Sequence, residues 1–267
     1  MAPADYSLSA LKVNRPRLER LVGCVVREPW GNSVSISASM RRALINPANE
    51  ALIGTARPYF PRGGPVPSRP PKGLETSSSG WGGMDAGSRM LYPAQVVDGL
   101  VHQHGGRALR DALVAAAPVL EEVANGEHVR CRVGDAILTA APPSLPFDVI
   151  LHTPPPFFPS DSQQPSSVKD WESQLASCYI SALRLAALSA AQAGQDRVML
   201  ATPLLGAGAR GAPTREAARV LVHAFQSPQA LEATPDRIKD VLVRVVVADD
   251  QSDRELLAEM MRAGRPS

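Results

Sequence analysis

The chain of 267 residues has few of the features that mark several protein classes. Its three cysteines, Cys24, Cys131 and Cys178, are odd in number and far apart, which indicates a reducing compartment and buried thiols. The formal net charge is only +2, so no strong field attracts nucleic acid or an anionic membrane. No apolar run reaches the roughly 18 residues of a spanning segment, so no membrane helix is expected.

Targeting and metal-binding signals are also missing. The first 20 residues mix charges and prolines without an apolar stretch, so we expect no secretory signal and an intracellular protein, cytoplasmic or nuclear. His102 and His104 have no Cys, Asp or Glu at ligand spacing nearby, so a zinc site is not expected. We also expect no cofactor. We expect no nucleic-acid or membrane partner.

Proline and apolar residues are abundant. The 25 prolines are about 9% of the chain, against ~5% in typical proteins, and many fall in two stretches at 55–87 and 153–167. These stretches predict long loops, which are usually functional or disordered. Because 44% of the residues are hydrophobic, the chain can also bury a core that needs neither disulfides nor metal.

Hydrophobic periodicity predicts strands that alternate with helices from the middle of the chain onward. This alternation favours an α/β protein with helices on both faces of its sheet. The predicted strands are 21–28, 33–37, 43–46, 136–139, 147–152, 197–201 and 241–247, and the predicted helices are 106–124, 171–188, 213–225 and one from Ser252.

A glycine-rich segment, Gly206–Gly211 (GAGARG), follows a predicted strand and precedes a predicted helix. Glycines let backbone N–H groups approach a phosphate, and the helix N-terminus adds partial positive charge. Arg210 offers a cation for a diphosphate. A plain tight turn is the alternative. A Rossmann site fits badly because the loop comes late and no acidic residue ends a strand about 20 positions later.

Two amides and a carboxylate that lie earlier in the chain are further candidates for ligand binding. Asn46 and Asn49 lie at the end of a predicted strand, where open α/β sheets bind ligands, and amides can pair with sugar hydroxyls. An Asx turn around Pro47 is the alternative. Asp98, in Val-Asp-Gly, fits either a helix N-cap or a carboxylate at the rim of a site.

Taken together, six segments resemble, in order, the motifs of the macro domains, which bind ADP-ribose and in some branches hydrolyse ADP-ribosyl esters on proteins. The resemblance spans roughly residues 20–263. The segments are Ala43–Leu52 (ALINPANEAL), Val96–Gly106 (VVDGLVHQHGG), Cys131–Thr139 (CRVGDAILT), Val149–Thr153 (VILHT), Leu175–Leu183 (LASCYISAL) and Pro203–Pro213 (PLLGAGARGAP).

The resemblance implies a three-layer α/β/α sandwich with a central mixed sheet. Residues 1–20 would form an N-terminal extension. Residues 21–267 would form a single domain with a Pro/Gly-rich insertion at about 55–95. The implied function is binding of ADP-ribose and hydrolysis of ADP-ribosyl esters, with ADP-ribose or an ADP-ribosylated protein as partner. A non-catalytic ADP-ribose reader module and a site for another nucleotide are the alternatives.

The resemblance also assigns roles to individual residues. Asn49 would contact the distal ribose, and Asp98 would position or activate a water near it. The remaining ligand-binding residues would be Asn46, Gly82 and Gly83, with Gly206, Ala207, Gly208, Ala209, Arg210 and Gly211 wrapping the diphosphate.

The sequence departs from the family pattern at several of these positions. Ser35 stands where the family has its adenine-binding Asp, and Ala248 where an aromatic residue stacks on adenine. Arg210 replaces the Tyr of the diphosphate loop. The glycine run that normally precedes Val-Asp-Gly lies upstream instead, beside Trp81, a candidate for stacking on a ligand base, and Asp85, an alternative counterpart to Asp98.

Overall fold

A six-stranded mixed sheet is the centre of the computed structural model, which describes residues 16–22, 25–26, 40–54, 97–123, 127–159, 165–208, 210–247 and 250–263. Neighbouring strands are parallel except for the last pair, β6 and β5, which is antiparallel. In spatial order the strands are β1 (Arg17–Val22), β8 (Asp240–Val247), β7 (Arg197–Pro203), β2 (Met40–Pro47), β6 (Val149–Thr153) and β5 (Ile137–Ala140).

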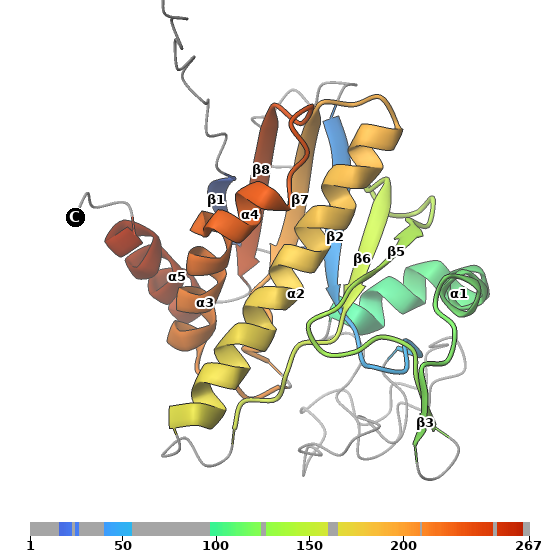
Figure 1. The fold of residues 1–267 in the computed structure, drawn as a ribbon, viewed down its shortest axis with the longest axis horizontal. Helices are drawn as coiled ribbons and strands as arrows, with labels where there is room; N and C mark the ends of the chain where they lie inside the picture. Colours follow the sequence, from blue (N-terminus) through green and yellow to red (C-terminus); the bar gives the residue numbers. More distant parts are fainter. Residues whose placement is uncertain are drawn as a thin grey trace, which may run out of the picture.

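Helices cover both faces of this sheet, which confirms the predicted three layers. α1 (Val97–Ala116) packs on one face, and α2 (Pro165–Gln192) crosses the front of the other face in Figure 1. α3 (Thr214–Gln226), α4 (Pro228–Glu232) and α5 (Asp250–Ala263) complete the second helical layer. A short hairpin of β3 (Glu121–Val123) and β4 (Glu127–Val129) follows α1.

Side chains of alternate strand residues pack into two separate apolar cores, one on each face of the sheet. On β8, Val243 and Val245 pack toward α2, α3 and α5, whereas Val246 packs toward the α1 side. Each fully buried valine stabilises the fold by about 1.5–3 kcal/mol relative to exposure. The nearly continuous apolar run of β8 therefore follows from burial on both faces, as predicted for a parallel strand.

Two predicted boundaries are wrong, and both errors involve sequence that is locally ambiguous. β1 begins at Arg17 rather than residue 21, so residues 17–20 of the expected extension belong to the sheet. This edge strand is rich in charge, and Arg17 and Arg20 pair with Asp240 and Asp253. Its sequence therefore lacks apolar alternation.

The helix predicted over 106–124 lies earlier, at 97–116, and it bends at Gly106, whose φ is +53°. Pro118 follows its end, and residues 121–123 form a strand instead. The strand predicted at 33–37 lies outside the described residues.

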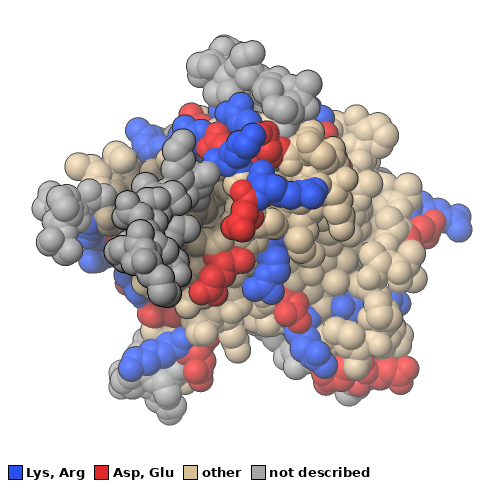
Figure 2. Space-filling model, turned by 45° about the horizontal axis from the view of Figure 1, so that its top comes forward, with Lys and Arg blue, Asp and Glu red and all other residues tan. Residues whose placement is uncertain are grey.

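Opposite charges are paired at the amino ends of the parallel strands. Asp240 accepts from both Arg17 and Arg197, and Arg42 binds Asp148 with a shortest N–O distance of 2.6 Å. The face seen in Figure 2 accordingly shows Lys and Arg side chains interspersed with Asp and Glu. In the described part of the chain, no helix combines the length and apolar character needed to cross a bilayer.

We expect the hydroxyl of Tyr179 to stabilise the segment that follows β7. The ring is fully buried, and the backbone N–H of Leu205 donates to Oη over 2.9 Å. Tyr179→Phe keeps the ring but leaves this buried N–H unpaired, which costs about 1–3 kcal/mol. Urea unfolding measures the loss, and an unchanged free energy of unfolding would contradict this role.

Candidate ligand-binding site

The candidate site lies where β2 and β6 end side by side. The strands are parallel, and their register places Asn46 beside His152 and Pro47 beside Thr153. The first turn of α1 brings Asp98 to the same point, although 52 residues separate it from Asn46. Open α/β sheets bind ligands at the carboxyl ends of their strands, and these residues occupy that edge.

A buried hydrogen-bond network joins four side chains at this edge. Asn46 Nδ2 donates to Asp98 Oδ1 over 2.7 Å and lies 3.1 Å from His152 Nδ1. On its other side, His152 Nε2 lies 2.9 Å from the Thr139 hydroxyl of β5. Asn46 and His152 are completely inaccessible to solvent, so solvent does not compete for these bonds.

The network holds a carboxylate in an environment that opposes its charge. Burial raises the pKa of Asp98 above the ordinary aspartate value, while nearby His102, the Asn46 hydrogen bond and the charge of Arg210 each lower this pKa. His102 Nε2 lies 3.5 Å from Asp98 Oδ1, one helical turn away. Burial, with a smaller contribution from His102, lowers the pKa of His152 to about 3.

Several buried polar atoms around Asp98 have no hydrogen-bond partner among the described residues. They are Asn46 Oδ1 and both ring nitrogens of His102. A buried polar group without a partner is costly, so such groups commonly mark a place where a ligand or water binds. They belong to two side chains that contact the Asp98 carboxylate, so this edge is a candidate for binding a polar ligand.

Asn49 lies in the loop after β2, but its carboxamide is engaged within that loop. Nδ2 donates to the Gly54 carbonyl, and Oδ1 accepts from Ile53 N over 3.3 Å. Within the loop, Leu52 has a φ of +58°, which residues other than glycine seldom adopt. In this structure, then, Asn49 shapes the loop rather than presenting a free amide.

The predicted glycine-rich segment forms a tight loop between β7 and α3. Gly206 and Gly211 have φ angles of +82° and +78°, and Gly211 N donates to Gly208 O over 2.9 Å. Ala207 is half-buried and Gly208 is exposed. Glycine therefore occupies the two described positions of this loop where the backbone has a positive φ, a conformation that other residues seldom adopt.

Arg210 turns inward from this loop. It is 6% exposed, and its guanidinium carbon lies 4.2 Å from the centre of the Phe157 ring. Its charge lowers the pKa of Asp98, so the loop after β7 contributes directly to the electrostatics of the Asn46–Asp98 pair. The structure thus brings together the segments containing Asn46, Asp98 and Arg210. Gly82, Gly83, Ala209, Trp81, Asp85, Ser35 and Ala248 lie outside the described residues.

The family model of the macro domain matches residues 85–221, about half of the chain. This chain belongs to the macro domain family. No curated protein matches its sequence.

Solved structures of macro domains share the fold. The Oceanobacillus iheyensis macrodomain with ADP is 21% identical, with a TM-score of 0.55 over 94% of this chain and 93% of that chain. A mutant of that macrodomain with ADPR is 20% identical, with a TM-score of 0.52 over 94% and 95%. The macro domain of ganglioside induced differentiation associated protein 2 is 18% identical, with a TM-score of 0.55 over 93% and 85%.

The predicted site set did not include His102, Thr139, His152 or Phe157. His152 had a detectable signal, because it is a polar residue at the end of the apolar strand Val149–Thr153. The contact of Thr139 with His152 depends on the antiparallel pairing of β5 and β6, which no local pattern specifies.

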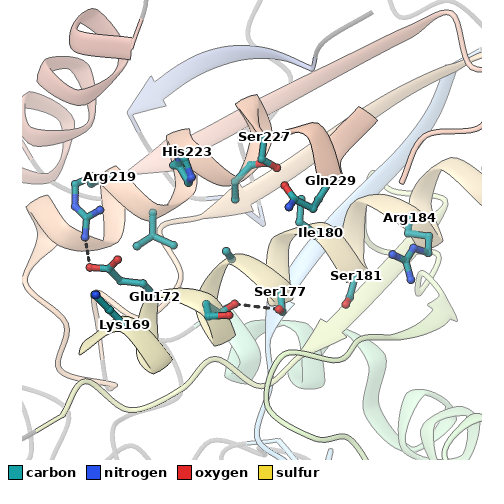
Figure 3. A pocket seen from close by; sticks show the side chains of 14 residues that line it. Lys169, Glu172, Ser177, Ile180, Ser181, Arg184, Arg219, His223, Ser227 and Gln229 are labelled. Atoms are coloured by element: carbon teal, nitrogen blue, oxygen red, sulfur yellow. Dashed lines mark hydrogen bonds and ion pairs between the residues drawn. The ribbon is translucent and has the colours of Figure 1, made fainter. Parts of the chain in front are cut away.

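A cavity of about 490 Å³ lies away from this site, between α2 and the α3–α4 segment (Figure 3). Arg219 crosses one end and pairs with both Glu172 and Glu216, so its charge is compensated. None of the described lining residues is a buried polar group without a partner.

In the described ranges, no cluster of three His, Cys, Asp or Glu could hold a metal ion.

The contact between Gly54 and His102 provides a test of the site's packing. Gly54 has a φ of +78°, and a Cβ there would lie 2.8 Å from His102 Cγ. Gly54→Ala therefore adds an overpacking cost of about 1–3 kcal/mol to a backbone strain of about 1–2 kcal/mol.

The matched control for that substitution is Gly194→Ala. Gly194 also has a positive φ, +71°, but its Cβ would meet nothing within 4 Å. Urea unfolding should show the larger loss for Gly54→Ala. Equal losses would mean that His102 moves away without cost.

Proposed function

We propose that this macro domain binds ADP-ribose and hydrolyses ADP-ribosyl esters on proteins. The observation that carries the proposal is the Asp98 carboxylate, 6% exposed and hydrogen-bonded to Asn46, at the carboxyl end of β2. The positively charged Arg210 loop adjoins it. Macro domains of the same fold with ADP and with ADPR support the choice of ligand.

The two parts of the site suit the two parts of this ligand. The diphosphate would lie along residues 206–211, where backbone N–H groups, the start of α3 and Arg210 favour an anion. The distal ribose would lie beside Asp98 and the unpartnered oxygen of Asn46, with which its hydroxyls can bond. In this pose the scissile ester would lie next to the carboxylate.

The reaction requires water and one base. Asp98 would orient a water molecule and accept its proton as the oxygen attacks, and the ester C–O bond would break. The proton would then pass to the departing group, so that ADP-ribose and a protein carboxyl group are the products. General-base assistance of this kind contributes ~10²–10⁴-fold to rate.

A non-catalytic reader is the second candidate, and one observation favours it. The Asn49 carboxamide, expected to contact the distal ribose, is bonded to the Gly54 carbonyl instead. If this bond persists with ligand bound, one contact that would align the sugar is missing. Binding would then occur without turnover.

The decisive experiment compares Asp98→Ala with the wild type on an ester-linked ADP-ribosylated protein. We expect the hydrolysis rate to fall by about 10²–10⁴-fold while ADP-ribose still binds. Asp111→Ala is the control, because Asp111 is an exposed carboxylate on the same helix. Wild-type binding without cleavage would identify a reader, and unchanged cleavage by Asp98→Ala would refute the role of Asp98.

Arg210 should determine affinity for the diphosphate. Replacing it with Ala removes a charge-assisted contact of about 1.5–3 kcal/mol, so calorimetry should show affinity for ADP-ribose lowered roughly 10–100-fold. Affinity for adenosine, which has no phosphate, should change little. Arg184→Ala, at an exposed arginine on α2, should leave both affinities unchanged. Equal losses for ADP-ribose and adenosine would argue against a diphosphate contact.

A further inference from the structure

We infer that His152 is a positioning residue, a neutral imidazole that turns the amide nitrogen of Asn46 toward Asp98. The geometry that points to this role is the register pairing of Asn46 with His152, together with the distances of 2.7 Å and 3.1 Å that Asn46 Nδ2 makes to Asp98 Oδ1 and His152 Nδ1. Its importance for catalysis rests on the proposed function of Asp98.

The number of hydrogens on Asn46 fixes the protonation of the imidazole. A carboxamide nitrogen carries two hydrogens, and here one faces Asp98 and the other faces His152 Nδ1. A ring nitrogen that accepts a hydrogen bond carries no proton. The proton of neutral His152 is therefore on Nε2, which donates to the Thr139 hydroxyl over 2.9 Å.

Burial protects this arrangement from acid. His152 is fully buried, and its pKa is lowered to about 3, so the ring stays neutral over the physiological pH range. An imidazolium would carry donors on both nitrogens and could not accept from Asn46. The amide would then turn its oxygen toward His152, and the Asn46 donor to Asp98 would be lost.

Asp98 depends on the Asn46 donor because the other described neighbouring groups stabilise its charge without donating a hydrogen bond to it. His102 on α1 and Arg210 on the loop after β7 act on it through charge, whereas Asn46 on β2 donates a hydrogen bond. His152 on β6 acts through Asn46. In the described structure both close contacts of the carboxylate use Oδ1. Losing the Asn46 donor raises the pKa of Asp98 further, so the carboxylate would protonate at higher pH.

Thr139 offers the least disruptive way to change the tautomer. Thr139→Val removes the oxygen that accepts from Nε2, so the imidazole proton is free to move to Nδ1 and displace the Asn46 bond. Thr139→Ser keeps that oxygen and is the matched control. Neither substitution changes a group that contacts Asp98 directly. Melting curves report whether both variants fold.

The first measurement is NMR on the full chain, with and without these substitutions. Long-range proton–nitrogen spectra of wild type should show His152 protonated on Nε2 only, without titration between about pH 5 and about pH 7.5, because this range lies well above its lowered pKa of about 3. His152→Asn identifies the signals by their loss. Protonation on Nδ1, or titration near the ordinary histidine value, would overturn the inference.

The second measurement is the titration of the Asp98 carboxyl carbon. The midpoint should rise by about one pH unit in Thr139→Val and stay at the wild-type value in Thr139→Ser, since a hydrogen bond to a charged group corresponds to at least that shift. His152→Asn places an oxygen near the Nδ1 position, so it should shift the midpoint less than His152→Leu. Identical midpoints in all variants would overturn the inference.

The same variants separate this inference from the proposed function. If wild type hydrolyses the ester, the acid limb of its pH profile should move upward in Thr139→Val together with the Asp98 midpoint. A merely structural role would lower activity without moving that limb, and this result would count against the inference. If wild type neither binds nor cleaves, the proposed function fails, and the NMR titrations still decide the role of His152.

Discussion

The site depends on one carboxamide that is shared between a carboxylate and an imidazole. Asn46 has two hydrogens to donate, and the parallel register of β2 and β6 directs one toward His152 while α1 brings Asp98 to the other. A buried carboxylate is costly without donors, so this bond helps Asp98 to remain inside the protein. The same burial that opposes its charge also makes the carboxylate a stronger base.

The surroundings of Asp98 differ in chemistry from one side to the other. On the sheet side, Asn46, His152 and Thr139 form a chain of neutral hydrogen-bonding groups. On the loop side, Arg210 brings a full positive charge, stacked on Phe157, to a position where the family motif has a tyrosine. A cation buried near the carboxylate stabilises its ionised form and also favours an anionic ligand. Arginine at position 210 therefore influences both the ionisation of Asp98 and the proposed binding of the diphosphate.

The sequence predicted most of the sheet because buried parallel strands are apolar along their whole length. β2, β6, β7 and β8 were each predicted within a few residues, and the glycine loop was placed correctly between β7 and α3. The failures share a cause. β1 is a charged edge strand with ion pairs to β8 and α5. The first half of α1 contains glycines and histidines, which have low helix propensity, and it packs against the sheet through Leu100 and Val101.

The sequence by itself determined the fold class, the family and the segments that contribute to the site, because these follow from local periodicity and from motifs read in order. Only the tertiary structure decided which atoms meet. The engagement of Asn49 within its own loop, the inward turn of Arg210 and the bond between Thr139 and His152 all depend on strand register and burial. Register is set by the packing of the whole sheet, so no short stretch of sequence specifies it.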